Sequence, residues 1–527
     1  MKAPHCQVAV VGSGFAGSLT AMVARQLGLS TVLIERARHP RFAIGESSTP
    51  LANLLLEEIA DEYRLPFVRP LSKWGSWQRQ LPHLACGLKR GFTFYKHEFG
   101  RAFAPDPRRE RQLLVGASPN ERIADTHWYR PDFDKYLVEQ AQRLGVTYWE
   151  ETRLTEAREE ADGLRLAGSR GGEPIGLTAE FVIDATGPRG FLHHALNLPE
   201  QPLAGYPPTQ ALYSHFREVA PLPAAFSSGT EAPPYPPEQA AVHHVFPGGW
   251  VWVLKFNNGV TSAGVAANDA VANDLGFADG EAGWRRLLAR LPPLAEIFGP
   301  ARAMIPFVHS PRLPFQSATV AGPRWALLPY AAGFVDPLLS TGFPLALLGV
   351  SRIGRMLRND WRRPSFAAGL AEYGRLTALE LAAIVRLVGA LYATMNQFDL
   401  FRELSLLYFA AATYSETVRR LGRPQLADSF LLFRHPVFGP ELQAICAQAS
   451  QPLAPHQTGP LSERIRNAIA PLDVAGLSDP SRQAWYPAQT AALFASAAKV
   501  GASREDIAAM LENCGWRADE PQCRQSH

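Results

Sequence analysis

Two lysines lie in apolar or aromatic stretches of the sequence, where burial can change their protonation. Lys255 ends the apolar run WVWVLK, and Lys73 stands beside tryptophans in LSKWGSW. A lysine that burial keeps partly neutral can act as an acid, a base or a nucleophile. Glu46, in the segment GESSTP, can take or give a proton. We therefore treat Glu46, Lys73 and Lys255 as candidate catalytic residues.

Each of these residues also has a structural interpretation. Lys255 can be a charge that protects a strand edge from pairing. Lys73 can point to solvent while its stem packs on an indole ring. Glu46 can be an acid near the start of the helix expected in STPLANLLLEEIA, where Ser47, Ser48 or Thr49 could cap.

Two tryptophans flank Val251 in the stretch GGWVWVLKFNNG. Side chains alternate between the two faces of a strand, so Trp250, Trp252 and Leu254 should share one face. That face would present a large aromatic surface. We count both tryptophans among the candidate site residues, with ordinary sheet packing as the alternative.

The N-terminal segment predicts a nucleotide site. QVAVV, GSGFAG and SLTAMVARQLG have the form of a strand, a glycine turn and a helix, and TVLIE follows as a second strand. The turn supplies Gly12, Gly14 and Gly17 in the G-x-G-x-x-G spacing, together with Phe15 and Ala16. Such glycines allow a tight turn, the approach of a pyrophosphate, and close packing of helix on strand. Glu35, at the end of the second strand, can accept from a ribose hydroxyl, which favours FAD or NAD over NADP.

Three later segments point to FAD. They are HWYRPDFDKYLVEQA with Arg130, AEFVIDATGPRG with Asp184, and RWALLPYAAGFVDPLLSTG with Asp336 and Gly342. Their order and spacing resemble the FAD-dependent monooxygenase superfamily. The resemblance implies that Arg130 and Asp336 lie at FAD and that the 339–343 turn lies beside its isoalloxazine ring.

Four motifs narrow the resemblance to the flavin-dependent halogenases and their close relatives. They are Gly45-Glu46-Ser47 with Pro50, the tryptophan strand, GFVDPLLSTG, and ACGLKRGFTFYKH. The family implies that reduced FAD and oxygen convert a halide into hypohalous acid, which a lysine presents to an aromatic carbon. It also implies that Ser47 lies near the flavin, that chloride or bromide binds at Thr341 and Gly342, and that the tryptophans separate flavin from substrate. A partner reductase usually supplies the reduced flavin.

The sequence departs from this family at the lysine. Alignment on ACG puts Ser76 at the lysine's place, with Lys73 three residues earlier, and Leu254-Lys255 replaces an Ile-Pro pair. We therefore predict an FAD-dependent oxidoreductase that performs monooxygenase-like oxidation of an aromatic or conjugated metabolite. The alternatives are an active halogenase of a phenol, pyrrole or indole, and a non-catalytic FAD-binding scaffold or redox sensor.

These residues need a scaffold of the α/β class. We expect a Rossmann-like FAD-binding module over residues 1–365, with an inserted mixed β-sheet for the substrate (segments about 61–110 and 200–305). Residues 366–527 should form a helical C-terminal region. Apolar residues recur there at three- and four-residue spacing, which predicts two or more helices broken near Asn396. Their aromatic residues can pack in the core or cover the substrate end of the site.

Composition limits the partners. The chain has 527 residues, 46% of them hydrophobic, and a net charge of +3, which gives no argument for nucleic acid. Five scattered cysteines fit reduced thiols, and no set of His, Cys and carboxylate has convincing metal spacing. No uncharged apolar run reaches about 18 residues. We expect a cytoplasmic protein without a transmembrane segment, acting on a small aromatic or carrier-bound substrate.

Overall fold

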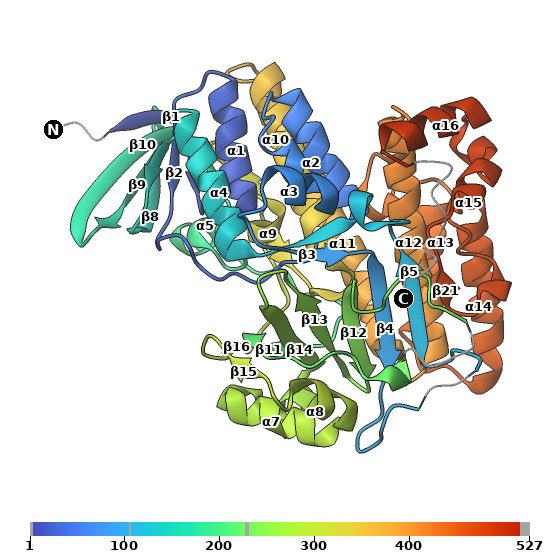
Figure 1. The fold of residues 1–527 in the computed structure, drawn as a ribbon. Coiled ribbons are helices and arrows are strands. Elements are labelled where there is room, and N and C mark those ends of the chain that lie inside the picture. The colour runs from blue at the N-terminus through green and yellow to red at the C-terminus, as the bar shows by residue number, and fades with distance from the viewer. Residues whose placement is uncertain (1–3, 105–106, 227–230, 517–527) are drawn as a thin grey trace.

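The computed structural model describes residues 4–104, 107–226 and 231–516, and Figure 1 shows their arrangement. The nucleotide-binding part is an eight-stranded sheet in the order β18-β19-β10-β1-β2-β7, extended from β10 by the antiparallel strands β9 and β8. Strands β19, β10, β1, β2 and β7 are parallel to one another. The strands of this sheet are β1 (His5–Val11), β2 (Thr31–Ile34), β7 (Thr147–Trp149), β8 (Thr152–Glu160), β9 (Gly163–Arg170), β10 (Glu173–Asp184), β18 (Ala321–Gly322) and β19 (Trp325–Leu327).

Helices cover this sheet, as its continuous apolar strands require. Helix α1 (Phe15–Gln26) joins β1 to β2 and packs against α4 (Arg130–Arg143) and α10 (Gly342–Asn359). Helix α10 also packs on α2 (Pro50–Glu62). Three shorter helices are α3 (Trp74–Gln80), α5 (Phe191–Ala195) and α9 (Pro329–Ala332). The predicted α/β fold with a Rossmann-like module is confirmed.

A second, nine-stranded sheet carries the tryptophan strand. Its order is β15-β11-β14-β13-β12-β4-β5-β21, with β16 also paired to β11. Its strands are β4 (Gly91–Lys96), β5 (Gln112–Gly116), β11 (Thr209–Arg217), β12 (Ala241–Phe246), β13 (Gly249–Lys255), β14 (Thr261–Asn268), β15 (Arg302–Ala303), β16 (Val308–Ser310) and β21 (Trp485–Tyr486). Two small sheets pair β3 (Cys86–Lys89) with β6 (Asp125–Trp128), and β17 (Phe315–Gln316) with β20 (Gly333–Phe334).

Side chains on the two faces of β13 pack into two different hydrophobic clusters, as the predicted alternation of faces requires. Trp250, Trp252 and Leu254 belong to the main hydrophobic core that also contains the nucleotide-binding sheet. Val251 and Val253 belong to a second cluster. This second cluster includes apolar residues of α7 (Glu281–Arg290) and of α8 (Pro292–Phe298). Both helices follow α6 (Asp269–Asp274) in the chain.

The C-terminal region is helical, as expected. Its helices are α11 (Ser365–Thr394), α12 (Phe398–Arg420), α13 (Phe438–Ala449), α14 (Pro455–Ile469), α15 (Thr490–Ala495) and α16 (Arg504–Asn513). The break between α11 and α12 contains Asn396, where the sequence predicted it. The main core continues from the nucleotide-binding sheet into these helices. The boundary at residue 365 coincides with the start of α11 and, as a domain boundary, stays a prediction.

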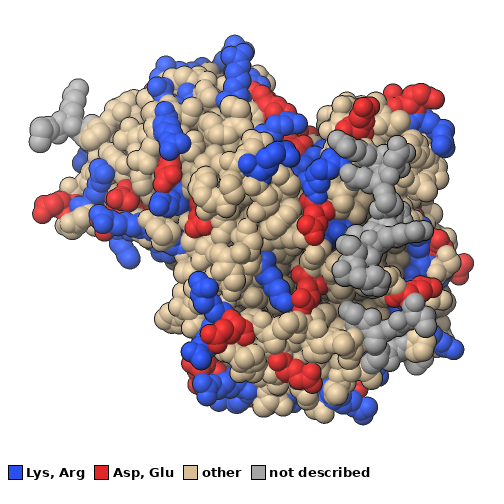
Figure 2. Space-filling view, in the orientation of Figure 1, with Lys and Arg blue, Asp and Glu red and all other residues tan. Residues whose placement is uncertain are grey.

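In the described part of the chain, α11 is long and apolar enough to cross a membrane by length and composition. However, 72% of its most apolar window is buried inside the protein, as in a core helix. Figure 2 shows Lys and Arg side chains interspersed with Asp and Glu over the visible face, in keeping with the small net charge.

Candidate active site

The nucleotide loop is shaped for a diphosphate. Gly12 has φ +99°, and a Cβ there would lie 2.6 Å from the carbonyl oxygen of Ala185. A Cβ at Gly17 would lie 1.9 Å from the Gly12 oxygen, so helix α1 needs glycine to approach the turn. At Gly14, a Cβ would lie 3.2 Å from Arg130 Nη2 and 3.8 Å from Arg41 Nη2. Two guanidinium groups and the N-terminus of α1 thus converge at one point, which suits the pyrophosphate of FAD.

Glu35 lies beside this point and is already hydrogen-bonded. Its carboxylate accepts from the amide and hydroxyl of Ser13 at 3.1 and 2.9 Å and from the Ala37 amide at 3.0 Å. Arg41 donates to it at 3.2 Å. Burial would raise the pKa of Glu35, but Arg41 and these hydrogen bonds outweigh it and lower that pKa. Its role as a ribose acceptor stays a prediction, and Arg41 is a neighbour that sequence reasoning missed.

Arg130 joins the nucleotide loop to the Gly45-Glu46-Ser47 segment. Its Nε and Nη2 donate to Asp134, each at 2.8 Å, and its Nη1 donates to the Gly45 oxygen at 2.9 Å. The guanidinium carbon lies 5.2 Å from the Phe15 ring centroid. Phe15 packs on Phe343 in α10, and Ala16 is buried next to it. The predicted cofactor residues Phe15, Ala16 and Arg130 therefore surround one loop, and their contact with FAD stays a prediction.

The predicted halide turn precedes α10 and has an unusual backbone. Leu339 and Ser340 have φ values of 64° and 54°, in the left-handed region that non-glycine residues seldom adopt. The amides of Thr341, Gly342 and Phe343 have no acceptor among the residues that the structure describes. A Cβ at Gly342 would lie 2.2 Å from the hydroxyl of Tyr330. The turn thus presents free N–H groups beside a phenol hydroxyl, an arrangement that suits an anion.

An inner cavity of about 50 Å³ lies next to this turn. Its lining includes Glu46, Trp250, Trp252, Asp336 and Gly342. Trp250 Nε1 donates to Asp336 Oδ1 at 3.2 Å, so the tryptophan strand is fastened to the turn before α10. The same carboxylate accepts from the Leu338 amide at 2.9 Å and from two tyrosine hydroxyls, those of Tyr206 and Tyr392. The structure therefore gives Asp336 an anchoring contact, while its contact with FAD stays a prediction.

Glu46 forms a buried pair with a residue far away in the sequence. Its Oε1 lies 2.7 Å from Nε2 of His215 in β11, and both side chains are almost fully buried. Glu46 Oε2 and His215 Nδ1 have no hydrogen-bond partner in the described structure. The carboxyl predicted as a proton carrier thus has an imidazole beside it, but no feature of the sequence indicated this pairing across 169 positions.

A third lysine lies deeper than the two that the sequence suggested. Lys89, the last residue of β3, is fully buried. Its Nζ donates to Ser47 Oγ at 2.9 Å and to the Ser48 carbonyl oxygen. It also lies 3.7 Å from the centroid of the Phe92 ring. Burial lowers the pKa of Lys89 well below its ordinary range, and the charge of Asp125 only partly opposes this.

Lys89 lines neither the inner cavity nor a second, outer one, but its amine contacts one lining residue of each. This outer cavity, of about 150 Å³, is lined from α2, β4, β5, α12 and α16. Ser47 lines the inner cavity and Phe92 lines the outer one, and the Lys89 amine contacts both residues. Tyr408 and Phe409 of α12 also line the outer cavity. The C-terminal aromatics therefore contribute both to the core and to a wall of this cavity.

The lysines predicted from the sequence have other surroundings. Lys73 directly precedes helix α3, which spans Trp74–Gln80. Lys73 Nζ donates to the Cys514 oxygen at 3.0 Å and lies 3.8 Å from Glu57 Oε1. Ser76 Oγ donates to the Pro70 oxygen at 2.8 Å. Lys255 forms an ion pair with Glu238 at 3.0 Å, and both side chains are 33% exposed.

The sequence did contain a signal for Lys89. It lies in ACGLKRGFTFYKH, a motif already matched to the family, as a charge within a run of strand residues. The alignment on ACG points to Ser76 as the position of the family's lysine. The pairing of β3 with β6 instead brings position 89 to Ser47.

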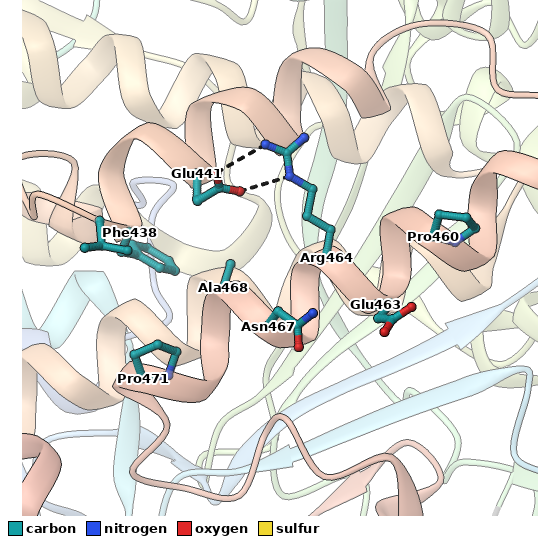
Figure 3. Close-up of a pocket in the computed structure, with 9 residues that line it drawn as sticks. Phe438, Glu441, Pro460, Glu463, Arg464, Asn467, Ala468 and Pro471 are labelled. Carbon is teal, nitrogen blue, oxygen red and sulfur yellow. Dashed lines mark hydrogen bonds and ion pairs between the residues drawn. The ribbon is translucent and has the colours of Figure 1, made fainter.

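A larger concavity, of about 340 Å³, lies between α13 and α14 (Figure 3). Its wall contains Val437, Phe438 and Pro460, and Arg464 Nε donates to Glu441 at 2.9 Å. None of the predicted site residues lines it. We therefore place the candidate chemistry in the inner and outer cavities.

Comparisons with known proteins identify the family and the fold. Residues 7–335 match the family model of the FAD dependent oxidoreductases. Two relatives are each 29% identical to this chain: monodechloroaminopyrrolnitrin halogenase PrnC of Pseudomonas fluorescens over 375 residues and tetracycline 7-halogenase of Kitasatospora aureofaciens over 372 residues. The alignments cover 70% and 68% of this chain and 64% of each relative.

Among solved structures, that of the halogenase PltM in complex with phloroglucinol and FAD has the same fold, with a TM-score of 0.78 and 23% identity. It covers 91% of this chain and 99% of that one. The family match spans more than half of the chain and includes the glycine loop, Glu35, Arg130 and the tryptophan strand. The chain belongs to the family of FAD-dependent oxidoreductases, enzymes whose cofactor the N-terminal motif and the three later segments together predicted.

Proposed function

We propose that this protein halogenates a small aromatic molecule, using reduced FAD, oxygen and a halide ion. The observation that carries the proposal is the fully buried amine of Lys89, which contacts Ser47 on one cavity and Phe92 on the other. The sequence favoured monooxygenase-like oxidation because the family's lysine was missing at position 76. Lys89 supplies a candidate for that lysine, so halogenation becomes the preferred function.

The chain offers groups that would hold the reactants. Arg41, Arg130 and the N-terminus of α1 would bind the diphosphate of FAD, and the free amides of Thr341 and Gly342 would bind the halide. Bound in its reduced form, FAD would supply two electrons to oxygen, and the halide would supply two more as it is converted into hypohalous acid, with water as the other product.

Lys89 would carry the halogen from one cavity to the other. A neutral amine attacks the halogen of hypohalous acid, so that an N–X bond forms and the O–X bond breaks. The departing hydroxide takes the amine proton and leaves as water. This step needs an unprotonated amine, and burial favours that form of Lys89. Ser47 and Ser48 fix the position of Nζ, so the halogen would be presented at the Phe92 side.

The tryptophans support halogen transfer over direct oxygenation. Trp250 and Trp252 line the inner cavity and do not line the outer one, and Asp336 fixes Trp250 through its indole N–H. An aromatic substrate in the outer cavity would therefore be kept from the flavin. Oxygen transfer to the ring requires contact with the flavin, whereas hypohalous acid is small enough to move toward Lys89.

Partners and location form part of the proposal. A cavity of about 150 Å³ favours a free molecule with one or two rings over a substrate held on a carrier protein. The resemblance to flavin-dependent halogenases supports a partner flavin reductase and a cytoplasmic location.

Product analysis tests the proposed function. The FAD-loaded protein is mixed with a flavin reductase, NADH, oxygen and a panel of phenols, pyrroles and indoles, with bromide, chloride or no halide. We expect products that gain bromine or chlorine only when the halide is present, detected by mass spectrometry. Hydroxylated products that form equally well without halide would instead support the monooxygenase function.

A further inference from the structure

A carboxyl group and an amide group that line the outer cavity each have a buried oxygen that accepts no hydrogen bond from the described residues. Asp125 begins β6, and Asn53 lies in α2. Asn53 Nδ2 donates to Asp125 Oδ1 at 2.7 Å, and both residues line the outer cavity. Asp125 Oδ2 and Asn53 Oδ1 are buried and have no hydrogen-bond partner within the described residues. Buried polar atoms are rarely left unpaired, because this costs free energy that a ligand can recover.

The neighbouring cations are already engaged. Lys89 is directly opposite Asp125 in the pairing of β3 with β6, but its amine donates to Ser47 and Ser48. Arg420 Nε donates to Glu416 at 2.7 Å, and its Nη1 lies 3.4 Å from Glu57 Oε2. Asp125 Oδ2 and Asn53 Oδ1 can therefore accept hydrogen bonds from a molecule bound in the cavity.

We propose that Asp125 and Asn53 bind the O–H or N–H donor of an aromatic substrate, a ring hydroxyl or amino group, and that Asp125 takes a proton from a hydroxyl. This inference rests on the proposed halogenation and names the substrate class of its outer cavity. The donor group lies beside the amine that would carry the halogen, since Asp125 and Lys89 are cross-strand neighbours. The ring would pack on the apolar wall formed by Phe92, Phe409, Met510 and Trp516.

Proton removal would make the ring a better nucleophile at the moment of transfer. The hydroxyl proton passes to Asp125, and the electron pair of a ring carbon attacks the halogen on Lys89 Nζ. A C–X bond forms and the N–X bond breaks, and its electron pair stays on nitrogen, which receives the proton from Asp125. The ring carbon then loses its own hydrogen as a proton, and the ring oxygen regains one. The net result is one haloamine and one phenol converted into one amine and one halophenol.

Three probes that share the indane ring and differ in one substituent test the binding step without catalysis. They are 5-indanol, 5-aminoindane and 5-methoxyindane, added to the FAD-loaded, oxidised protein and followed by ligand-observed NMR. We expect the hydroxyl or amino compound to bind about ten- to hundredfold more tightly than the ether, the range expected for a hydrogen bond to a charged group. The tighter of the two donor compounds identifies the donor. Equal affinity for all three compounds in the wild-type protein would overturn the inference, without any variant having to fold.

A variant pair then tests the proton transfer. Asp125→Asn keeps an acceptor oxygen but cannot take a proton, so bromination of 5-indanol should fall about a hundredfold or more. Glu441→Gln, which neutralises a carboxylate between α13 and α14, is the matched control and should keep the wild-type rate.

The results separate the two proposals. Donor selectivity that Asp125→Asn reduces, without halogenated product under any condition, would refute halogenation and support the donor site. Halogenation that proceeds equally for 5-indanol and 5-methoxyindane, and equally in wild type and Asp125→Asn, would refute the donor site and support halogenation.

Discussion

Replacing Lys89 by methionine should separate halogen transfer from folding. Methionine is an unbranched side chain only one atom shorter than lysine, so it keeps most of the volume and the fully buried position stays largely filled. The change removes the hydrogen bonds to Ser47 and Ser48, which costs about 1–3 kcal/mol in total. It also removes the cost of keeping a polar amine away from water, again about 1–3 kcal/mol. Because these terms oppose each other, the free energy of unfolding should stay within about 2 kcal/mol of the wild-type value.

The rate of product formation should change far more. A positioned acid–base or nucleophilic group contributes about 10²–10⁴-fold to a rate. Lys89→Met should therefore form halogenated product at least about a hundredfold more slowly, while the visible spectrum of bound FAD stays unchanged. The assay is bromination of a phenol, quantified by mass spectrometry, with thermal unfolding of the same preparation measured in parallel.

Two other lysines complete the experiment. The pair between Lys255 and Glu238 is one-third exposed and is worth only about 0–1 kcal/mol, so Lys255→Met should brominate within about threefold of the wild-type rate. Lys73→Met changes the lining of the outer cavity, so it should raise KM and leave the maximal rate largely unchanged. The reasoning fails if Lys89→Met keeps wild-type turnover, or if Lys255→Met loses as much activity as Lys89→Met.

Three further variants test other parts of the site. Gly17→Ala would place a Cβ 1.9 Å from the Gly12 oxygen and should abolish FAD binding in absorbance spectra. Gly28→Ala is the control, because Gly28 has φ +83° and no atom lies within 4 Å of a Cβ there. It should lower the free energy of unfolding by only about 1 kcal/mol and should still bind FAD. Gly342→Ala would place a Cβ 2.2 Å from the Tyr330 hydroxyl and should raise the bromide concentration for half-maximal rate about tenfold or more; an unchanged bromide titration would count against the halide site. Trp250→Phe removes the donor to Asp336 and should lower the free energy of unfolding by about 1–3 kcal/mol in urea titrations, with less halogenated product per reduced flavin consumed.

The parts of the fold that depend on local sequence could be predicted. The strand, turn and helix around Gly12, Gly14 and Gly17 are contiguous, so their geometry follows from neighbouring residues. The alternation along β13 assigned Trp250 and Val251 to opposite faces, because the period of a strand does not depend on its neighbours. The break near Asn396 likewise follows from helical periodicity.

The parts of the site that depend on pairing between distant segments could not be predicted. His215 lies next to Glu46 because β11 belongs to the second sheet, and neither residue type nor spacing indicates that contact. The sequence does not indicate the contact of Lys89 with Ser47, because 42 positions separate the two residues along the chain. The pairing of β3 with β6 brings the two side chains into contact in the folded protein. Asp125 was overlooked for the same reason, since its importance depends on the lysine opposite it.

The cost of burial distinguishes Lys89 from the other two lysines. Lys73 and Lys255 retain 22% and 33% exposure of their side chains and have carboxylates within 4 Å, so ordinary stability explains both. Lys89 is fully buried without an ion pair to Asp125, and the neighbouring carboxyl retains an unpaired oxygen. A hydrophobic pair at these two positions would fill the same space at lower cost, as replacements of buried charged groups commonly show. These two polar residues, which face each other across a strand pair and oppose stability, are therefore better explained by the proposed halogen transfer than by the fold they occupy.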